Sequence, residues 1–233
     1  MIKVISSERL PVKMWLNDIQ EGALEQAKHL ANLPFTFKHV AIMPDSHQGY
    51  GMPIGGVLAT HGVIIPNAVG VDIGCGMCAI QTNLREIERE TLRHVVGKIQ
   101  HTVPVGFEWH KQAQPESILP ERKSKKYMPV VWRQYQKARH QVGTLGGGNH
   151  FIEIQRGSDG YIWIMIHSGS RNTGKKVADH YNAIAVHLNE RWFSQTPPKA
   201  WQLAFLPINS PEGKLYRNEM DIASTLHLQI VNG

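Results

Sequence analysis

The chain has 233 residues, of which 42% are hydrophobic and 19% charged. These proportions are typical of a globular protein with a sizeable core, in one large domain or two small ones. The chain shows no signal segment and no apolar run near the roughly 20 residues that span a bilayer, so we expect a cytoplasmic protein without membrane contact. A net charge of +6 suits a polyanionic partner without identifying one.

Apolar spacing predicts the elements of the first third of the chain. We expect a strand and a turn in residues 1–14, a helix over 19–33, a strand over 39–43 and two strands within 53–71. Asp45 and His47 fall in the polar stretch 44–51, for which we predict a turn. They are candidate metal ligands, a candidate acid/base pair, or merely residues that cap the strand through turn chemistry.

The stretch from Asn67 to Met77 reads as an apolar, strand-like run that ends in Asp72 and Cys75 among glycines. Glycines let the backbone turn sharply, so a carboxylate and a thiolate can be aimed at one point, as a transition-metal site requires. The alternative is a tight turn with an inert cysteine. Cys75 and Cys78 also form a C-x-x-C pair, which suggests a redox site, although no amphipathic helix follows.

The second half alternates helical and glycine-rich stretches. The apolar spacing of residues 86–99 predicts a surface helix, and residues 101–128 are irregular. Four cations at 122–126 are typical of a solvated loop, or would bind phosphates. Glycines at 143–148 lead into a predicted strand in which Asn149, His150 and Glu153 supply a donor, a metal ligand and an acceptor. A buried strand ending at His167 and a helix over 177–188 follow.

Residues Gly169–Lys175 fit the phosphate-binding pattern G-x-x-x-x-G-K between a strand and a helix. A P-loop ATPase is therefore an alternative. Against it, Lys176 stands where such a loop needs Ser or Thr to hold magnesium, and we find no second acidic strand.

Four strand-to-loop junctions carry the candidate side chains: Asp45/His47, Asp72/Cys75, Asn149/His150 and His167. Such junctions tend to meet at one rim of a sheet, where ligand clefts form. The pattern therefore predicts a site for one or two metals, and the thiolate by itself favours zinc.

Several of these motifs resemble the RtcB family of RNA ligases. The likeness rests on residues 11–15, 43–49, 70–77, 145–153 and 167–171, and runs in order to about residue 220. It implies an α+β fold of mixed sheets flanked by helices, forming one catalytic domain over residues 1–233. It also implies a GTP- and manganese-dependent enzyme that joins a 3′-phosphate or 2′,3′-cyclic phosphate RNA end to a 5′-hydroxyl end in tRNA splicing and RNA repair.

The resemblance also assigns residues. By it, Asp72, Cys75 and His150 would hold one manganese ion (Mn²⁺), and Cys75 with His167 would hold the second, so that the thiolate bridges both. This replaces zinc as the expected metal. A guanylate-binding stretch would comprise Asn149, His150, Phe151, Ile152 and Glu153.

The chain also departs from the family pattern. Family members continue beyond it, and the histidine that takes GMP covalently, a third histidine of the second metal and most guanine contacts have no counterpart here. His227 lacks the family context. We therefore expect a C-terminally truncated member that is inactive alone. A non-catalytic remnant that binds metal or RNA ends is the alternative.

Overall fold

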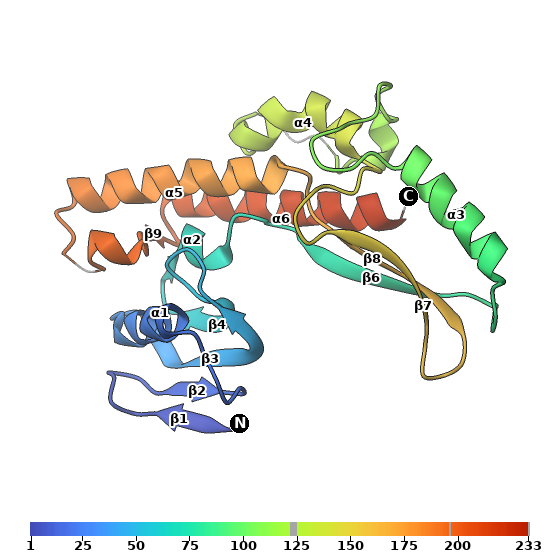
Figure 1. Ribbon diagram of the computed structural model, residues 1–233. Coiled ribbons are helices and arrows are strands. Elements are labelled where there is room, and N and C mark those ends of the chain that lie inside the picture. Colours follow the sequence, from blue (N-terminus) through green and yellow to red (C-terminus); the bar gives the residue numbers. More distant parts are fainter. Residues whose placement is uncertain (122–124, 196, 233) are drawn as a thin grey trace. The chain divides into compact units, whose positions relative to one another are not determined.

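The computed structural model describes residues 1–121, 125–195 and 197–232, and the side chains of residues 226–232 lie outside that description. The chain divides into two compact units (Figure 1). The first comprises Met1–Val71 with Ala178–Tyr216, and the second Asp72–Val177 with Arg217–Gly233. The expected α+β class is confirmed, because sheets and helices occur in both, and the sheet of the first unit is mixed. A single domain over residues 1–233 stays a prediction.

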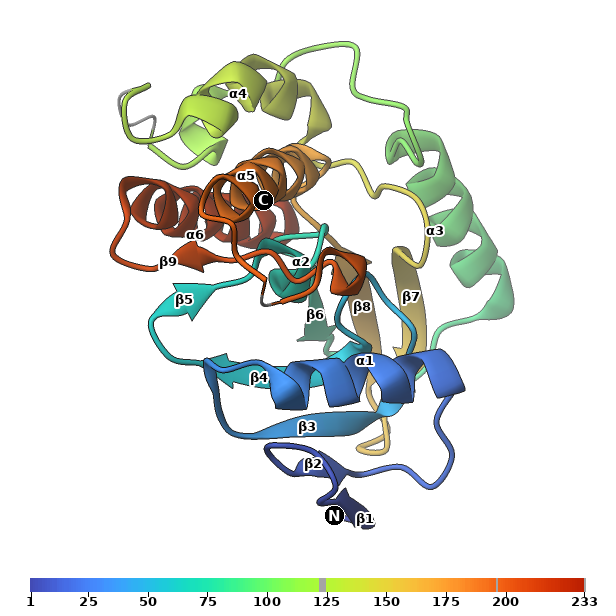
Figure 2. The same cartoon turned by 90° about the vertical axis from the view of Figure 1, so that its left-hand side faces the viewer.

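The first unit is built on a four-stranded sheet, in the order β1 (Lys3–Ile5), β2 (Val12–Met14), β3 (Thr36–His47) and β4 (Ile54–Thr60). Only β2 and β3 pair in parallel. The predicted first helix is α1 (Glu21–Asn32), which packs on this sheet (Figure 2). Its buried face joins apolar side chains of β2 and β3 in the core, including Ala27, Leu30, Val12, Met14 and Ile42.

Strand β3 is longer than predicted. It runs through Pro44, Asp45 and His47, where the sequence had suggested a turn, because pairing with β4 continues as far as His47 opposite Ile54. The register is irregular between Ile42 and His47. A proline, which has no N–H to donate to the ladder, is tolerated at such an irregularity.

The prediction of a strand-like run over residues 67–77 is wrong. The chain forms the short helix α2 (Pro66–Val69), followed by a turn, and the next strand starts only at Gly76. Pro66 suits the first position of a helix, and Gly70, at φ 95°, ends it in a conformation that favours glycine. Before α2, β5 (Val63–Ile64) pairs antiparallel with β9 (Leu206–Pro207).

The second unit contains an antiparallel sheet in the order β6 (Gly76–Gln81), β8 (Ile162–Ser168) and β7 (Phe151–Arg156). Helix α3 (Arg89–Thr102) has no buried residue, which agrees with the predicted surface helix. A 3₁₀ turn (Glu116–Ile118) and α4 (Pro129–Gln141) follow. Helices α5 (Thr173–Arg191) and α6 (Pro211–Asn232) contribute residues to both units, and a 3₁₀ turn (Lys199–Trp201) lies between them.

The start of α4 is capped from α6. Glu219 is fully buried, and its Oε1 accepts hydrogen bonds from the backbone N–H groups of Val130 and Val131, at 2.7 Å each. A carboxylate at this end also complements the helix dipole. Among the described helices, none is long and apolar enough to cross a membrane.

Candidate metal centre

Strand register gathers the candidate ligands of the second unit. Strands β6 and β7 both run antiparallel to β8, and Met77 and Phe151 both pair with His167. The first residues of β6 and of β7 therefore lie at the same end of the sheet as the last residues of β8. Cys75 stands just before β6 and His150 just before β7, so three junctions far apart in sequence meet at that edge.

The side chains approach one another closely. Cys75 Sγ lies 3.0 Å from His167 Nε2 and 3.7 Å from His150 Nε2. His150 Nε2 is 3.2 Å from Asp72 Oδ2. One ligand atom from each of Cys75, His150 and His167 falls within 4.8 Å of the others. The structure thus brings together the four residues that were predicted as ligands, although their binding of a metal stays a prediction.

The donor set fits a first-row transition metal. It combines one carboxylate, one thiol and two imidazoles, and neighbouring donors are 3.0–3.7 Å apart. Ligands at about 2.0–2.3 Å from a tetrahedral ion stand about 3.3–3.8 Å from one another, which is close to these separations. Transition-metal ions bind sulfur and imidazole nitrogen well, whereas magnesium and calcium prefer oxygen ligands.

Electrostatics also favour a cation at this point. Partial burial, and then the hydrogen bond and negative charge of Asp72, raise the pKa of Cys75 to about 12, against a smaller lowering by the backbone of Gly76. The thiol is therefore protonated at neutral pH when no cation is present. A bound metal reverses this balance, because it binds the thiolate and displaces the proton.

Glycines leave room for this cluster. An added Cβ at Gly169 would lie 2.7 Å from Asp72 Oδ1, and one at Gly146 would lie 2.6 Å from His150 Nδ1. Gly146 also has a φ of 97°, which disfavours any other residue. Sequence reasoning identified these glycine-rich loops but not the side chains that fill the space beside each glycine.

Arg171 holds the loops around the cluster in place. Its Nε donates to Thr144 Oγ1 at 2.8 Å and its Nη2 donates to the Gly106 carbonyl at 2.9 Å. Burial lowers the pKa of this guanidinium, and the negative charge of Asp72 partly offsets that effect. Arg171 is buried, so its guanidinium holds backbone in this chain.

The remaining candidates lie elsewhere. Asp45 and His47 belong to β3 in the first unit, where His47 Nδ1 is 2.9 Å from the Asp45 carbonyl oxygen. Asp45 Oδ1 fills the space where a Cβ on Gly55 would stand, 2.9 Å away. Cys78 pairs with Ile166 inside the sheet, and both cysteines are free thiols. Cys75, and not Cys78, is therefore the cysteine of the ligand cluster.

The predicted guanylate-binding stretch spans the loop before β7 and the start of the strand. Asn149 is exposed in the loop, and Glu153 is exposed on β7 opposite Met165. The Phe151 ring meets His167 edge-on, with centroids 5.6 Å apart. Phe151 thus packs beside the candidate ligands, whereas the nucleotide role of the stretch stays a prediction.

The geometry argues against a P-loop at Gly169–Lys175. The preceding strand, β8, has antiparallel neighbours on both sides, whereas P-loops follow strands of parallel sheets. The Gly174 N–H, which a phosphate would need as a donor, is already bonded within the loop to Ser170 Oγ at 2.8 Å. A Cβ on Gly174 would collide with the backbone of Ile73, so this glycine faces protein and not a phosphate.

Comparison with known proteins decides the family. The model of the family "tRNA-splicing ligase RtcB" matches residues 26–131 and 120–228. The chain belongs to the RtcB family. The match reaches eight residues beyond residue 220, where sequence inspection had placed the end of the likeness.

Curated RtcB proteins show the same relationship. The RNA-splicing ligase RtcB of Escherichia coli K12 is 37% identical over 200 residues, which cover 78% of this chain and 49% of that protein. The tRNA-splicing ligases RtcB of Aeropyrum pernix and Thermococcus kodakarensis are 32% and 30% identical, covering 93% of this chain and 56% and 55% of their own lengths. The chain thus spans about half the length of the RtcB relatives it matches.

The RtcB relatives also carry internal segments that this chain lacks. The alignment with the Aeropyrum protein covers 271 positions, against 233 residues in the whole chain, so at least 38 of them have no counterpart here. The two family matches overlap at residues 120–131.

Proposed function

We propose that this chain is the metal-binding part of a GTP- and manganese-dependent RNA ligase. The reaction would join a 3′-phosphate or 2′,3′-cyclic phosphate end to a 5′-hydroxyl end, in tRNA splicing or RNA repair in the cytoplasm. The observation that carries the proposal is the convergence of Asp72, Cys75, His150 and His167 in a member of the RtcB family.

Each side chain of the cluster has a proposed role. Asp72, Cys75 and His150 would hold one manganese ion, and Cys75 with His167 would hold a second. The metals would neutralise charge on the phosphates and polarise them. Because Cys75 Sγ lies within 3.7 Å of the Nε2 atoms of both histidines, it is the natural bridging ligand. The stretch Asn149–Glu153 would contact the guanylate, and Asp45 or His47 would be the residues to test for an acid/base role.

We further propose that the 233 residues alone bind metal but do not ligate. Covalent guanylylation needs a nucleophile in line with the α-phosphate, and no residue here matches the family's histidine. His227 is the first alternative to test, and its side chain lies outside the described residues. A non-catalytic protein that holds metal or RNA ends is the second candidate, favoured by the same cluster.

Metal binding is tested by calorimetry with Mn²⁺ and Zn²⁺. Cys75→Ala should abolish tight binding, because it removes the donor shared by both histidines. Cys78→Ala is the matched control and should change binding little, since Cys78 lies within β6 opposite Ile166. If Cys78→Ala proved the damaging change, the assignment of ligands would be wrong.

The ligase proposal is tested with radiolabelled GTP and RNA ends. The 233-residue chain should acquire no covalent GMP and seal no ends in the presence of Mn²⁺. Fusion to the unmatched portion of the Escherichia coli relative should restore labelling, and Cys75→Ala in that fusion should remove it. A labelled band from the unfused chain would refute the proposed inactivity, and His227→Ala would then show whether His227 is the acceptor.

A further inference from the structure

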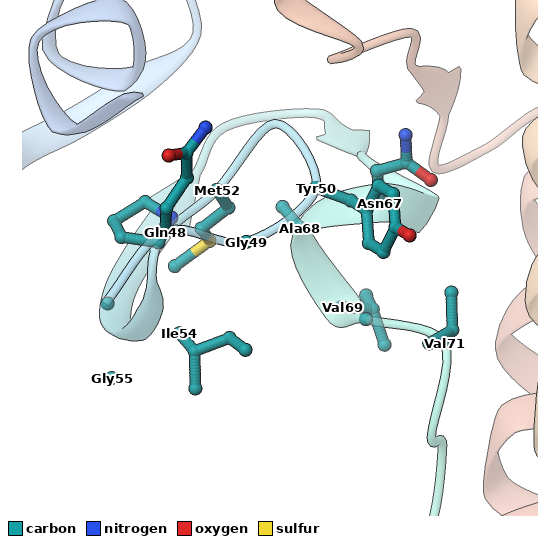
Figure 3. Close-up of a pocket in the computed structure, with 13 residues that line it drawn as sticks. Gln48, Gly49, Tyr50, Met52, Ile54, Gly55, Asn67, Ala68, Val69 and Val71 are labelled. Carbon is teal, nitrogen blue, oxygen red and sulfur yellow. The ribbon is translucent and has the colours of Figure 1, made fainter. Parts of the chain in front are cut away.

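One cavity lies within the first unit, and its lining ends at Val71, the residue before Asp72 (Figure 3). It has a volume of about 650 Å³ and is lined by residues of 48–56, after β3, and by residues 67–71 of α2 and the turn behind it. Small-molecule sites in proteins usually measure about 300–1,000 Å³. The cavity is therefore large enough for one flat organic group.

Both walls of this pocket are fixed by hydrogen bonds. The side chain of Gln26 donates to the Gly49 carbonyl at 2.6 Å and accepts the Gly49 N–H at 3.0 Å. On the other wall, Asn67 Nδ2 donates to the carbonyl oxygen of Gln202 at 2.8 Å. The same carbonyl packs against Gly51, where an added Cβ would lie 2.8 Å from it. Gln202 thus connects the two walls, and the pocket is preformed.

The lining does not suit a phosphate. None of its residues is Asp, Glu, Lys, Arg or His. Three of its backbone donors are also engaged, since Ala68 and Val69 donate to the Ile65 carbonyl at 3.0 and 3.1 Å, and Gly70 to that of Pro66 at 3.2 Å. An anion would therefore find no cationic side chain in this lining, and the start of α2 offers it none of these three N–H groups.

The lining does suit a flat, uncharged ring. Tyr50 is 70% exposed, and Ile54 and Val69 are also exposed, so the pocket presents apolar surface to solvent. Aromatic side chains bind nucleobases by stacking, whatever the base. Since Asn67 Nδ2 is engaged by Gln202, its Oδ1 is the acceptor that the amide can offer to an amino or imino group of a base.

We propose that this pocket receives a nucleobase of the RNA end, stacked on Tyr50 and hydrogen-bonded to Asn67. The choice of RNA rests on the proposed function. The pocket then supplies a base-binding subsite that needs neither metal nor phosphate contacts.

The test uses the whole chain with metal removed by EDTA, in 0.5 M salt to screen phosphate contacts. The probes are adenosine, guanosine, cytidine and uridine, and binding is followed by NMR of the methyl groups of Met52, Ile54 and Val69. We expect saturable shifts at these methyl groups with each nucleoside. Ribose 5-phosphate should produce none.

Variants locate the stacking partner. Tyr50→Ala should weaken nucleoside binding at least fivefold, which corresponds to about 1 kcal/mol of stacking. Tyr50→Phe retains the ring and should bind within twofold of the wild type. Phe37→Ala is the matched control, because Phe37 is an exposed aromatic residue of the same sheet outside the pocket. Asn67→Ala should weaken binding with the fold intact.

The inference would be overturned if nucleosides produced no shifts, or if ribose 5-phosphate produced equal shifts. It would also be overturned if Phe37→Ala weakened nucleoside binding as much as Tyr50→Ala. Stronger shifts with N-acetyl-leucinamide would overturn it too, because they would indicate a protein side chain as the ligand. Because no metal or GTP is present, failure here leaves the proposed function standing. Conversely, nucleoside binding would survive the failure of the ligation or metal-binding assays.

Discussion

A substitution at Gly146 tests how closely the glycine-rich loop is fitted to the metal cluster. Gly146 has a φ of 97° and Gly148 a φ of 73°, so alanine at either position must adopt an unfavourable left-handed conformation. The two positions differ in their surroundings. A Cβ on Gly148 meets nothing within 4 Å, whereas one on Gly146 collides with the guanidinium of Arg171 and approaches His150 Nδ1 to 2.6 Å.

The structure sets the expected magnitudes. Left-handed backbone costs about 1–2 kcal/mol for a residue with a Cβ, so Gly148→Ala should lower the free energy of unfolding by that amount. Gly146→Ala carries the same cost. It must also displace Arg171, whose two hydrogen bonds to the loops contribute about 0.5–1.5 kcal/mol each. We therefore expect Gly146→Ala to lower the free energy of unfolding by about 2–5 kcal/mol.

Chemical denaturation of the metal-free variants measures the stability difference, and calorimetric titration with Mn²⁺ measures the effect on the site. Gly146→Ala should weaken metal binding at least tenfold, because His150 is displaced from Cys75 and Asp72. Gly148→Ala should bind metal as the wild type does. Equal effects of the two substitutions on stability and on metal affinity would refute the argument that the Gly146 contact positions His150.

Three further predictions concern Glu219, Cys75 and the lysines at the start of α5. Glu219→Gln should lower the free energy of unfolding by about 1–3 kcal/mol, because α4 would no longer be capped by a buried carboxylate. The control is Asp221→Asn at an exposed position, which should change that free energy by less than about 0.5 kcal/mol in the same denaturation experiment. Alkylation of Cys75 in the metal-free protein should stay slow at pH 9 and accelerate only towards pH 12, because its raised pKa keeps the thiol protonated; an ordinary rate profile in a mass-spectrometric assay would contradict this. RNA binding should be weak and fall steeply with salt. Replacing the exposed Lys175 and Lys176 by glutamine should reduce the logarithmic salt slope by about 0.7 for each phosphate that the protein no longer neutralises, so that an unchanged slope would exclude these lysines as phosphate ligands.

Helical periodicity predicted the fold best where a helix has one buried face. The apolar positions of 19–33 correspond to α1, whose Ala27 and Leu30 are fully buried, and the helix predicted over 177–188 is part of α5. Strand limits were less predictable. The sequence cannot show that β4 pairs with β3 beyond Pro44, because that extension depends on a partner strand and not on local propensity.

The candidate ligands were predictable because each carries its own chemistry. Asp72, Cys75, His150 and His167 are residue types that bind metals, and each stands at a glycine-rich junction. Their supports carry no such signal. Nothing in the sequence distinguishes Arg171 from other loop cations, and only its burial and its hydrogen bonds to Thr144 and Gly106 show that it holds the backbone. Of the four cations predicted at 122–126 to form a solvated loop or to bind phosphates, those at 122 and 123 lie outside the described residues.

What the sequence left open was the register of the second sheet, and the candidate metal site depends on it. His167 is paired with Met77 on one side and Phe151 on the other. A slip of β8 by one residue would turn His167 to the opposite face, because side chains alternate along a strand. Cys75 would then face an apolar isoleucine or a serine in its place. The residue types thus predict that a metal can bind, whereas the register of three strands determines that Cys75, His150 and His167 meet at one point.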